Sequence, residues 1–394
     1  MLHLLIRIFI PNHKNISDLH VRRAYGTLCS ILGITLNALI SAFKLVAGAL
    51  SGSVAVTADG INNLTDAASS AITMIGFRIS GKKDDTEHPF GHGRMEYVSG
   101  LIVSMVIILM GFELARTSFT RILHPVHINL DRLTVASLLL SVAVKLYMFS
   151  YNRKIGALMD SLSLKAAGAD AISDVFASLA VLLSGFIHQF TGLNTDGWTG
   201  FIVSLFILRA GYRAARDTVS PLLGNPPDPE FVQKIEDIVL DHEQIYGMHD
   251  LIVHDYGPGR TLVSLHAEVP ADGNLIELHD MIDEAERRLK HQLKTEAVIH
   301  MDPVYTRNEK TVQLRSRIAA ALCEKIDPRI TIHDFRLSAC APGTNVLFDV
   351  VIPYGMNRTD EAILSDIHSA IRALDETLTP IVTIEHSYTP ETPQ

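Results

Sequence analysis

The chain has 394 residues, 47% of them hydrophobic, and its mean hydropathy of +0.22 is high for a soluble protein but low for membrane helices alone. A membrane part joined to a soluble part is therefore predicted. Residues 221–394 carry 29 Asp and Glu against 15 Lys and Arg, and this acidic half excludes nucleic acid as a partner.

The first apolar segment, MLHLLIRIFIP, is interrupted by His3, Arg7 and Pro11 and has no small-residue cleavage site. We therefore interpret it as a short segment on the membrane surface and not as a removable signal. Residues 1–25 are predicted to form a cytoplasmic N-terminal segment.

Six apolar stretches of about 20 residues or more can each cross a bilayer. They predict an α-helical membrane domain of six transmembrane helices over residues 26–216. Even parity puts both termini on one side, and the flanking Lys and Arg favour the cytoplasmic side of the plasma or inner membrane. The loop of residues 116–132 is discordant, because it would place three Arg outside. The stretches are residues 26–50, 53–80, 98–118, 132–151, 162–186 and 197–216.

After SPLLGNPPDPE the pattern changes to alternating strands and amphipathic helices. The order helix, two strands, helix and strand indicates a small α+β sandwich. Residues 221–304 are predicted to form this cytoplasmic domain. Its elements are expected at residues 229–242, 249–256, 261–269, 274–293 and 296–302.

The same order of elements then occurs a second time. Residues 248–270 align with residues 332–353, and residues 296–303 align with residues 380–388. A repeat at one nearly constant offset indicates two tandem copies of one module. Residues 305–394 are therefore predicted to form a second, divergent module.

The second and fifth apolar stretches each carry a pair of polar residues four positions apart, Asn62 with Asp66 and Asp170 with Asp174. On a helix each pair lies on one face, about 6 Å apart along the axis. An uncompensated carboxylate at that depth would cost at least ~2.5–3.5 kcal/mol, and neither stretch has a central Lys or Arg to compensate it. A cation that alternates with protons is the predicted partner. The alternative is polar helix packing or permanently protonated carboxyls.

The ligand atoms predicted for this site are all oxygens. Three carboxylates and one carboxamide suit hard cations such as Mn²⁺ or Mg²⁺ better than Zn²⁺ or Cu⁺. Few, strongly charged ligands favour Mn²⁺, with Fe²⁺ next. Asp59, one turn away, is interpreted equally well as an entrance acid or as a helix-terminal hydrogen-bonding group, whereas Lys44 is expected to snorkel.

The segments ADGINNLTDAASSAITMIGFRISGKKDDTEHPFGHGRMEY (58–97) and LKAAGADAISDVFASLAVLLS (164–184) resemble the cation diffusion facilitator family of divalent-metal/proton antiporters. The likeness extends from about residue 20 to residue 304. It implies a homodimer of six-helix subunits with a cytoplasmic ferredoxin-like domain, and a transport site at Asn62, Asp66, Asp170 and Asp174. Zinc-selective relatives commonly have His or Asp at the position of Asn62, so NNLTD resembles the manganese branch.

The segment DDTEHPFGHGR offers Asp85, His88 and His92 as a candidate loop site. Two His and an acid can hold a metal, and the family sometimes binds a second metal there. Because Pro89 and the neighbouring glycines argue against a regular helix, ordering of the turn is an equal alternative.

Five positions of the first tail module match regulatory metal positions of zinc-transporting relatives. They are His249, His266, His279, His300 and Asp302. Exposed histidines on a sheet are the alternative.

In the second module only His333 persists, as the counterpart of His249. His266 aligns there with Asp349, His300 with Glu385 and Asp302 with Ser387. This copy is therefore predicted to have lost the site and to serve packing, dimer contact or partner binding.

The sequence thus predicts a secondary active transporter that exports Mn²⁺ from the cytoplasm by metal/proton antiport. Zn²⁺ and Fe²⁺ are the alternative ions, and a membrane metal sensor or channel is the alternative function. No catalytic residues and no cofactor are predicted, apart from a structural or regulatory divalent metal in the tail. A membrane metallohydrolase would need a histidine near the acids, and neither stretch offers one.

Overall fold

The computed structural model describes residues 2–15, 18–51, 54–124, 132–304, 309–340, 343–353, 356 and 358–387. The chain divides into two compact units. The first comprises residues 1–225 with residues 255–260, and the second comprises residues 226–254 with residues 261–394.

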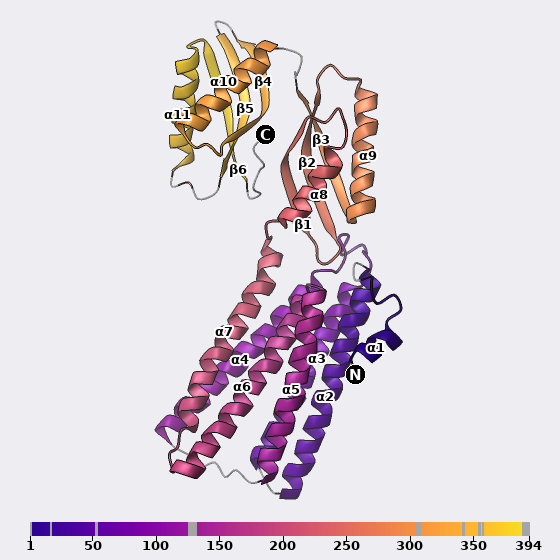
Figure 1. Ribbon diagram of the computed structural model, residues 1–394, viewed down its shortest axis with the longest axis vertical. Coiled ribbons are helices and arrows are strands. Elements are labelled where there is room, and N and C mark those ends of the chain that lie inside the picture. The colour runs from indigo at the N-terminus through magenta and orange to yellow at the C-terminus, as the bar shows by residue number, and fades with distance from the viewer. Residues whose placement is uncertain are drawn as a thin grey trace. The chain divides into compact units, whose positions relative to one another are not determined.

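The first unit is a bundle of long helices that run side by side (Figure 1). Each of the six apolar stretches of the sequence falls on one of these helices, whose ends extend beyond most of the predicted bounds. The short helix α1 (Leu2–Phe9) is formed by part of the segment MLHLLIRIFIP, which the sequence predicts at the membrane surface. The long helices are α2 (Leu19–Ser51), α3 (Val54–Ser80), α4 (Met95–Leu123), α5 (Arg132–Leu158), α6 (Leu162–Thr191) and α7 (Asp196–Leu223).

Within the described residues, four of these helices are long and apolar enough to cross a membrane. The apolar spans are His20–Ala47 within α2, and the whole of α4, α5 and α6. The chain is therefore a membrane protein with a helical transmembrane domain. Polar and charged side chains within α3 and α7 lower their hydropathy.

Small residues allow α4 and α7 to pack closely. A Cβ atom on Gly200 would lie 2.4 Å from Ser118 Oγ, and one on Gly111 would lie 3.1 Å from Ile207 Cγ2. Without a water-driven hydrophobic effect in lipid, such close packing is a main source of helix association.

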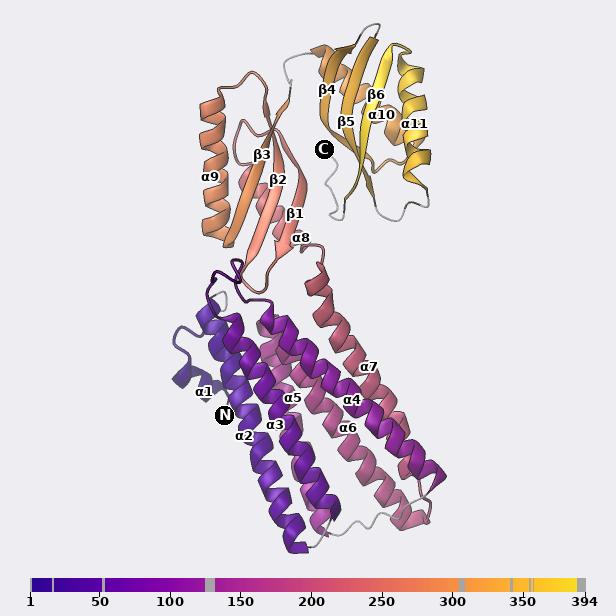
Figure 2. The same cartoon turned by 180° about the vertical axis from the view of Figure 1, so that it is seen from behind.

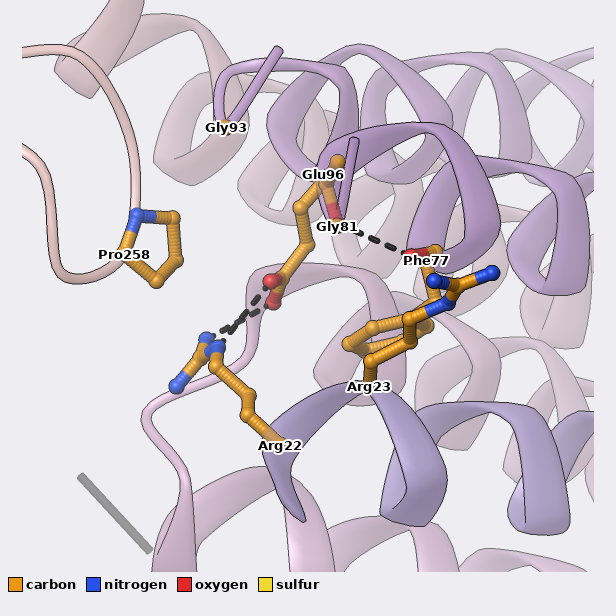
Figure 3. A pocket seen from close by; sticks show the side chains of 8 residues that line it. Arg22, Arg23, Phe77, Gly81, Gly93, Glu96 and Pro258 are labelled. Atoms are coloured by element: carbon orange, nitrogen blue, oxygen red, sulfur yellow. Dashed lines mark hydrogen bonds and ion pairs between the residues drawn. The ribbon is translucent and has the colours of Figure 1, made fainter. Parts of the chain in front are cut away.

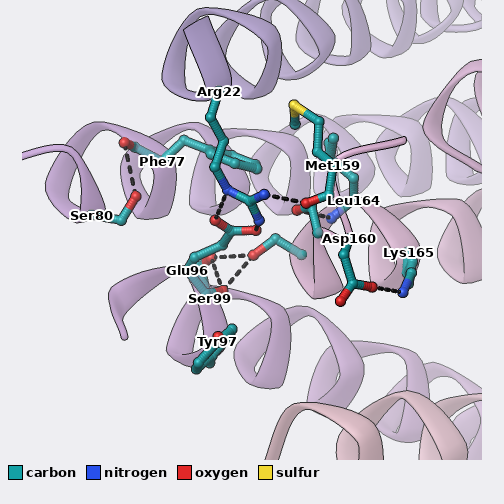
Figure 4. A network of polar contacts seen from close by, with 12 residues as sticks. Arg22, Phe77, Ser80, Glu96, Tyr97, Ser99, Met159, Asp160, Leu164 and Lys165 are labelled. Atoms are coloured by element: carbon teal, nitrogen blue, oxygen red, sulfur yellow. Dashed lines mark hydrogen bonds and ion pairs between the residues drawn. The ribbon is translucent and has the colours of Figure 1, made fainter. Parts of the chain in front are cut away.

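A buried polar network joins one end of α2, α4 and α6 (Figure 4). Glu96 is 1% exposed and forms a two-pronged ion pair with Arg22, with nitrogen–oxygen distances of 2.9 and 3.2 Å. Arg22 also donates to the carbonyl oxygen of Met159. The backbone carbonyl of Glu96 accepts hydrogen bonds from the hydroxyls of Ser99 and Ser163. This network holds three helices in register.

Replacing Glu96 with Ala is expected to lower the free energy of unfolding by about 3–5 kcal/mol, because Arg22 is left buried without its carboxylate. The measurement is the midpoint of heat-induced loss of the folded peak in detergent, followed by gel filtration. The double variant Arg22→Met/Glu96→Leu is the control and should recover most of the loss, since it removes both charges. A Glu96→Ala protein as stable as the wild type would contradict the role of this pair.

The second unit begins with α8 (Pro229–Val239) and a three-stranded sheet in the order β1-β2-β3 (Figure 2). The strands are β1 (Gly247–Asp255), β2 (Thr261–Pro270) and β3 (Thr295–Val304), with α9 (Leu275–Leu293) between β2 and β3. These elements match the predicted ranges to within three residues. β2 and β3 are parallel, and His266 lies opposite His300. The core between the helices and the sheet contains Ile235, Val239, Val263, Leu265, Ala285 and Leu289.

A second sheet follows, in the order β4-β5-β6. Its core has Phe348, Val350 and Ile367. In β5 and β6 the strands are again parallel, with Thr344 opposite Leu378. The elements are α10 (Glu309–Lys325), β4 (Thr331–Cys340), β5 (Gly343–Pro353), α11 (Asp360–Leu374) and β6 (Leu378–Ser387).

The strand register corrects one part of the sequence alignment between the two sheets. Asp302 lies opposite Glu268 in the first sheet, and Glu385 lies opposite Val351 in the second. The alignment of β2 with β5 sets His266 against Asp349, and therefore Glu268 against Val351. Glu385, opposite Val351, thus occupies the position of Asp302. The alignment that set Glu385 against His300 was wrong by two residues, because local sequence similarity carries no information on which residues of two strands lie opposite each other. The second sheet keeps an acid at this position.

The turn of residues 255–260, between β1 and β2, belongs to the helical unit. Arg94 donates from Nε and Nη2 to the carbonyl oxygen of Asp255, at 2.9 and 2.6 Å. The Tyr97 hydroxyl donates to Asp255 Oδ2 at 2.9 Å. The arginine of the segment GHGR therefore holds the turn of residues 255–260 against the start of α4.

Candidate metal centre

Three aspartates from two helices meet inside the bundle. Asp66 comes from α3, and Asp170 and Asp174 come from successive turns of α6. One carboxylate oxygen of each lies within 4.8 Å of the others. Their exposed fractions are 2%, 8% and 9%, so the cluster is shielded from solvent. The i, i+4 spacing of the α6 pair puts both carboxylates on one helix face, toward α3.

A lysine that the sequence did not indicate lies among these acids. Lys145 of α5 is 2% exposed, and its Nζ lies 2.7 Å from Asp66 Oδ2 and 2.6 Å from Asp174 Oδ2. Lys145 belongs to the fourth apolar stretch, whereas the aspartates belong to the second and fifth, so their spacing gives no sign of it. The only signal was one lysine near the centre of an apolar span, which marks a functional site by default.

The asparagines of NNLTD are placed on different sides of α3. Asn63 is 3% exposed, and its Nδ2 donates to the carbonyl of Asp59 at 2.8 Å. Asn62 lies one turn before Asp66 on α3, and its side chain is exposed. The structure thus brings together the three aspartates among the four predicted ligands.

Lys44 of α2 does not snorkel, contrary to expectation. It is 1% exposed, and its Nζ lies 2.6 Å from Asp59 Oδ2. A neighbouring helix supplies an acid at the depth of the ammonium, so the side chain has no need to reach the interface.

The loop residues Asp85, His88 and His92 also come together. Asp85 lies 3.5 Å from a ring nitrogen of each histidine, and it accepts a hydrogen bond from the backbone of His88 at 2.7 Å. That hydrogen bond lowers the pKa of Asp85. Asp85 therefore orders the turn and can also serve as a metal ligand, so both interpretations of this segment stand.

The pocket beside this loop has a different character (Figure 3). The Arg22–Glu96 ion pair forms one wall, with Phe77 and Pro258 also lining it. None of the three aspartates lines it. We therefore assign this pocket to the helix-joining network and not to a cation site.

In the first sheet, His249, His266 and Asp302 bring their ligand atoms within 4.8 Å of one another. Asp302 Oδ2 lies 2.9 Å from His266 Nδ1 and 3.2 Å from His249 Nε2. His300 Nε2 lies 3.2 Å from Asp302 Oδ1. His279 is exposed on α9 and is not part of this group among the described residues.

Burial and neighbouring acids shift the pKa values of these groups. Burial alone would lower the pKa of His249, but the carboxylates of Asp250 and Asp302 outweigh it and raise the pKa to about 10. Burial and a hydrogen bond with Asp250 raise the pKa of Glu385 to about 8. Any metal bound among these side chains would therefore release protons.

A helical membrane domain with a buried all-oxygen acid cluster, joined to a small mixed-sheet domain, defines a membrane protein that handles divalent cations. The family models agree. The model of the cation efflux transmembrane domain matches residues 30–223, and that of the cation efflux protein cytoplasmic domain matches residues 227–304.

Three relatives are similar over most of their lengths. An uncharacterized transporter of Methanocaldococcus jannaschii is 30% identical, over 70% of this chain and 97% of its own length. The manganese efflux system protein MneS of Bacillus subtilis is 30% identical, over 71% and 96%. The cation-efflux pump FieF of Salmonella typhi is 27% identical, over 72% and 95%. The chain belongs to the cation efflux family, also called cation diffusion facilitators, whose members are transporters.

Proposed function

We propose that this protein exports Mn²⁺ from the cytoplasm in exchange for protons. The observation that carries the proposal is the group of three buried aspartates on α3 and α6 whose oxygens converge. All-oxygen ligands favour Mn²⁺ over Zn²⁺ or Cu⁺. The manganese efflux protein among the relatives supports this ion, and the cation-efflux pump keeps Fe²⁺ and Zn²⁺ as alternatives.

Lys145 takes a direct part in this mechanism. Its ammonium holds the oxygens of Asp66 and Asp174 that a metal would need. Metal and ammonium therefore compete, and the lysine must move away when the ion binds. When the ion leaves, the lysine returns to Asp66 and Asp174 and protons neutralise the remaining charge, so the helices can reorient without leaving bare carboxylates in the bilayer.

The charge of the group predicts the proton count. Three carboxylates and one ammonium have a net charge of −2. One divalent cation or two protons neutralise that charge. We therefore infer an exchange of two protons for each metal ion, with Asp170 as one proton acceptor because Lys145 does not pair with it.

The architecture that goes with this function has three parts. α2 to α7 form six crossings of the plasma or inner membrane, with both termini cytoplasmic. The dimerisation-type cytoplasmic domain supports a homodimer. Equal strand order in the two sheets supports tandem ferredoxin-like modules over residues 221–304 and 305–394.

The decisive experiment uses purified protein in sealed vesicles with an internal pH dye. An inward Mn²⁺ gradient should drive metal uptake and expel protons, and an imposed pH gradient should accelerate uptake. A channel would pass Mn²⁺ without moving protons, and a hydrolase or a sensor would accumulate none. Either result would overturn the proposal.

Metal choice is tested at Asn62. Asn62 lies one turn from Asp66 on the same face of α3, so Asn62→His would offer a nitrogen ligand near the acids. It is expected to raise the ratio of Zn²⁺ to Mn²⁺ transport about tenfold, a change of about 1.4 kcal/mol in relative affinity. The ratio is measured by competition in vesicles. Asn63→His is the control, because Asn63 bonds within its own helix. An unchanged ratio in Asn62→His would remove Asn62 from the ligand set.

A further inference from the structure

We propose that the second unit holds an additional divalent-metal site at the junction of its two sheets, formed by His249, Asp250, His333 and Glu385. This site lies beside the first-sheet group of His266 and Asp302 and shares His249 with it, through the other ring nitrogen. Asp250 Oδ2 lies 3.7 Å from His266 Nδ1, so the two groups are adjacent. The ligands of the junction site come from β1, β4 and β6, so a bound ion would connect the two modules of one chain.

The two sheets present matching groups to each other. His249 and His333 are equivalent by the repeat, and their rings stack with centroids 4.1 Å apart. His249 Nε2 lies 3.2 Å from Asp302, and His333 Nε2 lies 3.3 Å from Glu385. Because Glu385 has the register position of Asp302, each sheet pairs the equivalent histidine with the equivalent acid.

The backbone makes this junction by breaking strand alternation. Asp250 has a φ of 54° and Asp334 a φ of 51°, the left-handed region in which Asp is enriched among non-glycine residues. In a regular strand, neighbouring side chains point to opposite faces. The left-handed residue after His249 lets Asp250 lie on the same side, where its oxygens reach both His249 and His333.

Three of the ligand spacings are close to those of a tetrahedral ion. Four ligands about 2.0–2.1 Å from such a centre lie roughly 3.3 Å from one another. Here His249 Nδ1 lies 3.3 Å from Asp250 Oδ2, and His333 Nε2 lies 3.8 Å from Asp250 Oδ1 and 3.3 Å from Glu385 Oε2. Two imidazoles with two carboxylates are typical of Zn²⁺ and similar borderline ions, unlike the all-oxygen group between the helices.

The two histidines are buried beside acids but are not hydrogen-bonded to them. His249 and His333 are 8% and 6% exposed. Among the described residues, no ring nitrogen of either has a hydrogen-bond partner, since the contacts at 3.2–3.8 Å lack hydrogen-bond geometry. Buried polar atoms are nearly always satisfied. A metal ion at the junction would satisfy Nδ1 of His249 and Nε2 of His333 together.

Zinc bound per chain is measured on the full-length protein after dialysis against buffered Zn²⁺. His333→Gln and Glu385→Gln should each remove one ion, or weaken its binding at least about 100-fold, the upper end for loss of a supporting group. His266→Gln should remove a different ion, so His266→Gln/His333→Gln should lose two. His291→Gln, at an exposed position of α9, is the control and should lose none.

Circular dichroism checks that each variant is folded. If His333→Gln is misfolded, the zinc content of Glu385→Gln, the milder change, decides the test. Full zinc binding by both junction variants would overturn the proposal. It would also be overturned if the double variant lost no more zinc than His266→Gln, because the two groups would then form one site.

Discussion

Replacing Asp170 with Asn is expected to reduce Mn²⁺ transport by at least about 100-fold, since losing one buried ionic partner costs about 3 kcal/mol or more. Asp66→Asn and Asp174→Asn should have similar effects, because each removes one of three converging oxygen ligands and one of the negative charges. Asn keeps the size of the side chain, so the loss reports charge and not packing.

The measurement is the initial rate of Mn²⁺ uptake into vesicles at equal protein abundance. Asp160→Asn is the matched control, because Asp160 is 88% exposed and lies in the turn before α6. It should transport at the wild-type rate. Wild-type transport by Asp170→Asn would place the transport site elsewhere.

Replacing Lys145 with Met should destabilise the metal-free protein by about 3–5 kcal/mol, the cost of removing one partner of a buried ion pair. Asp66 and Asp174 would then face each other without a cation. Because a divalent ion binds those same oxygens, Mn²⁺ should restore most of the lost stability. The wild type should gain less from Mn²⁺, since its metal must first displace the ammonium.

Both effects are read from the thermal midpoint in detergent with and without Mn²⁺. Lys165→Met is the control, because Lys165 is half-exposed and pairs with the exposed Asp160. It should change neither the midpoint nor the response to metal. If Lys145→Met were destabilised equally with and without Mn²⁺, the lysine would be a structural partner and not a competitor of the ion.

The same substitution also bears on the proton count. Without Lys145 the empty group has a net charge of −3, so two protons no longer balance it. Metal retention should then persist to lower pH, because an additional proton is required to displace the ion. This links the stability measurement to the exchange mechanism through one residue.

Short-range patterns in the sequence determined a large part of this protein. The length of the apolar stretches predicted the long helices, and strand alternation predicted β1, β2 and β3 to within three residues. The spacing of Asp170 and Asp174 predicted a shared helix face, because 3.6 residues per turn bring positions i and i+4 together. These features depend only on neighbours within a turn or a strand.

Only the tertiary structure decided which groups from distant segments meet. Lys145 joins Asp66 from 79 residues away, and Asn63 rather than Asn62 is buried, because helix rotation and neighbours set exposure. Likewise, strand pairing gives Glu385 the register position of Asp302. The left-handed φ of Asp250 puts its carboxylate on the same side as His249, whose ring stacks on that of His333. Local periodicity carries no information on these contacts, because they arise from packing between elements that are distant in the chain. The order of the elements does not determine which face of one helix or strand meets which face of another.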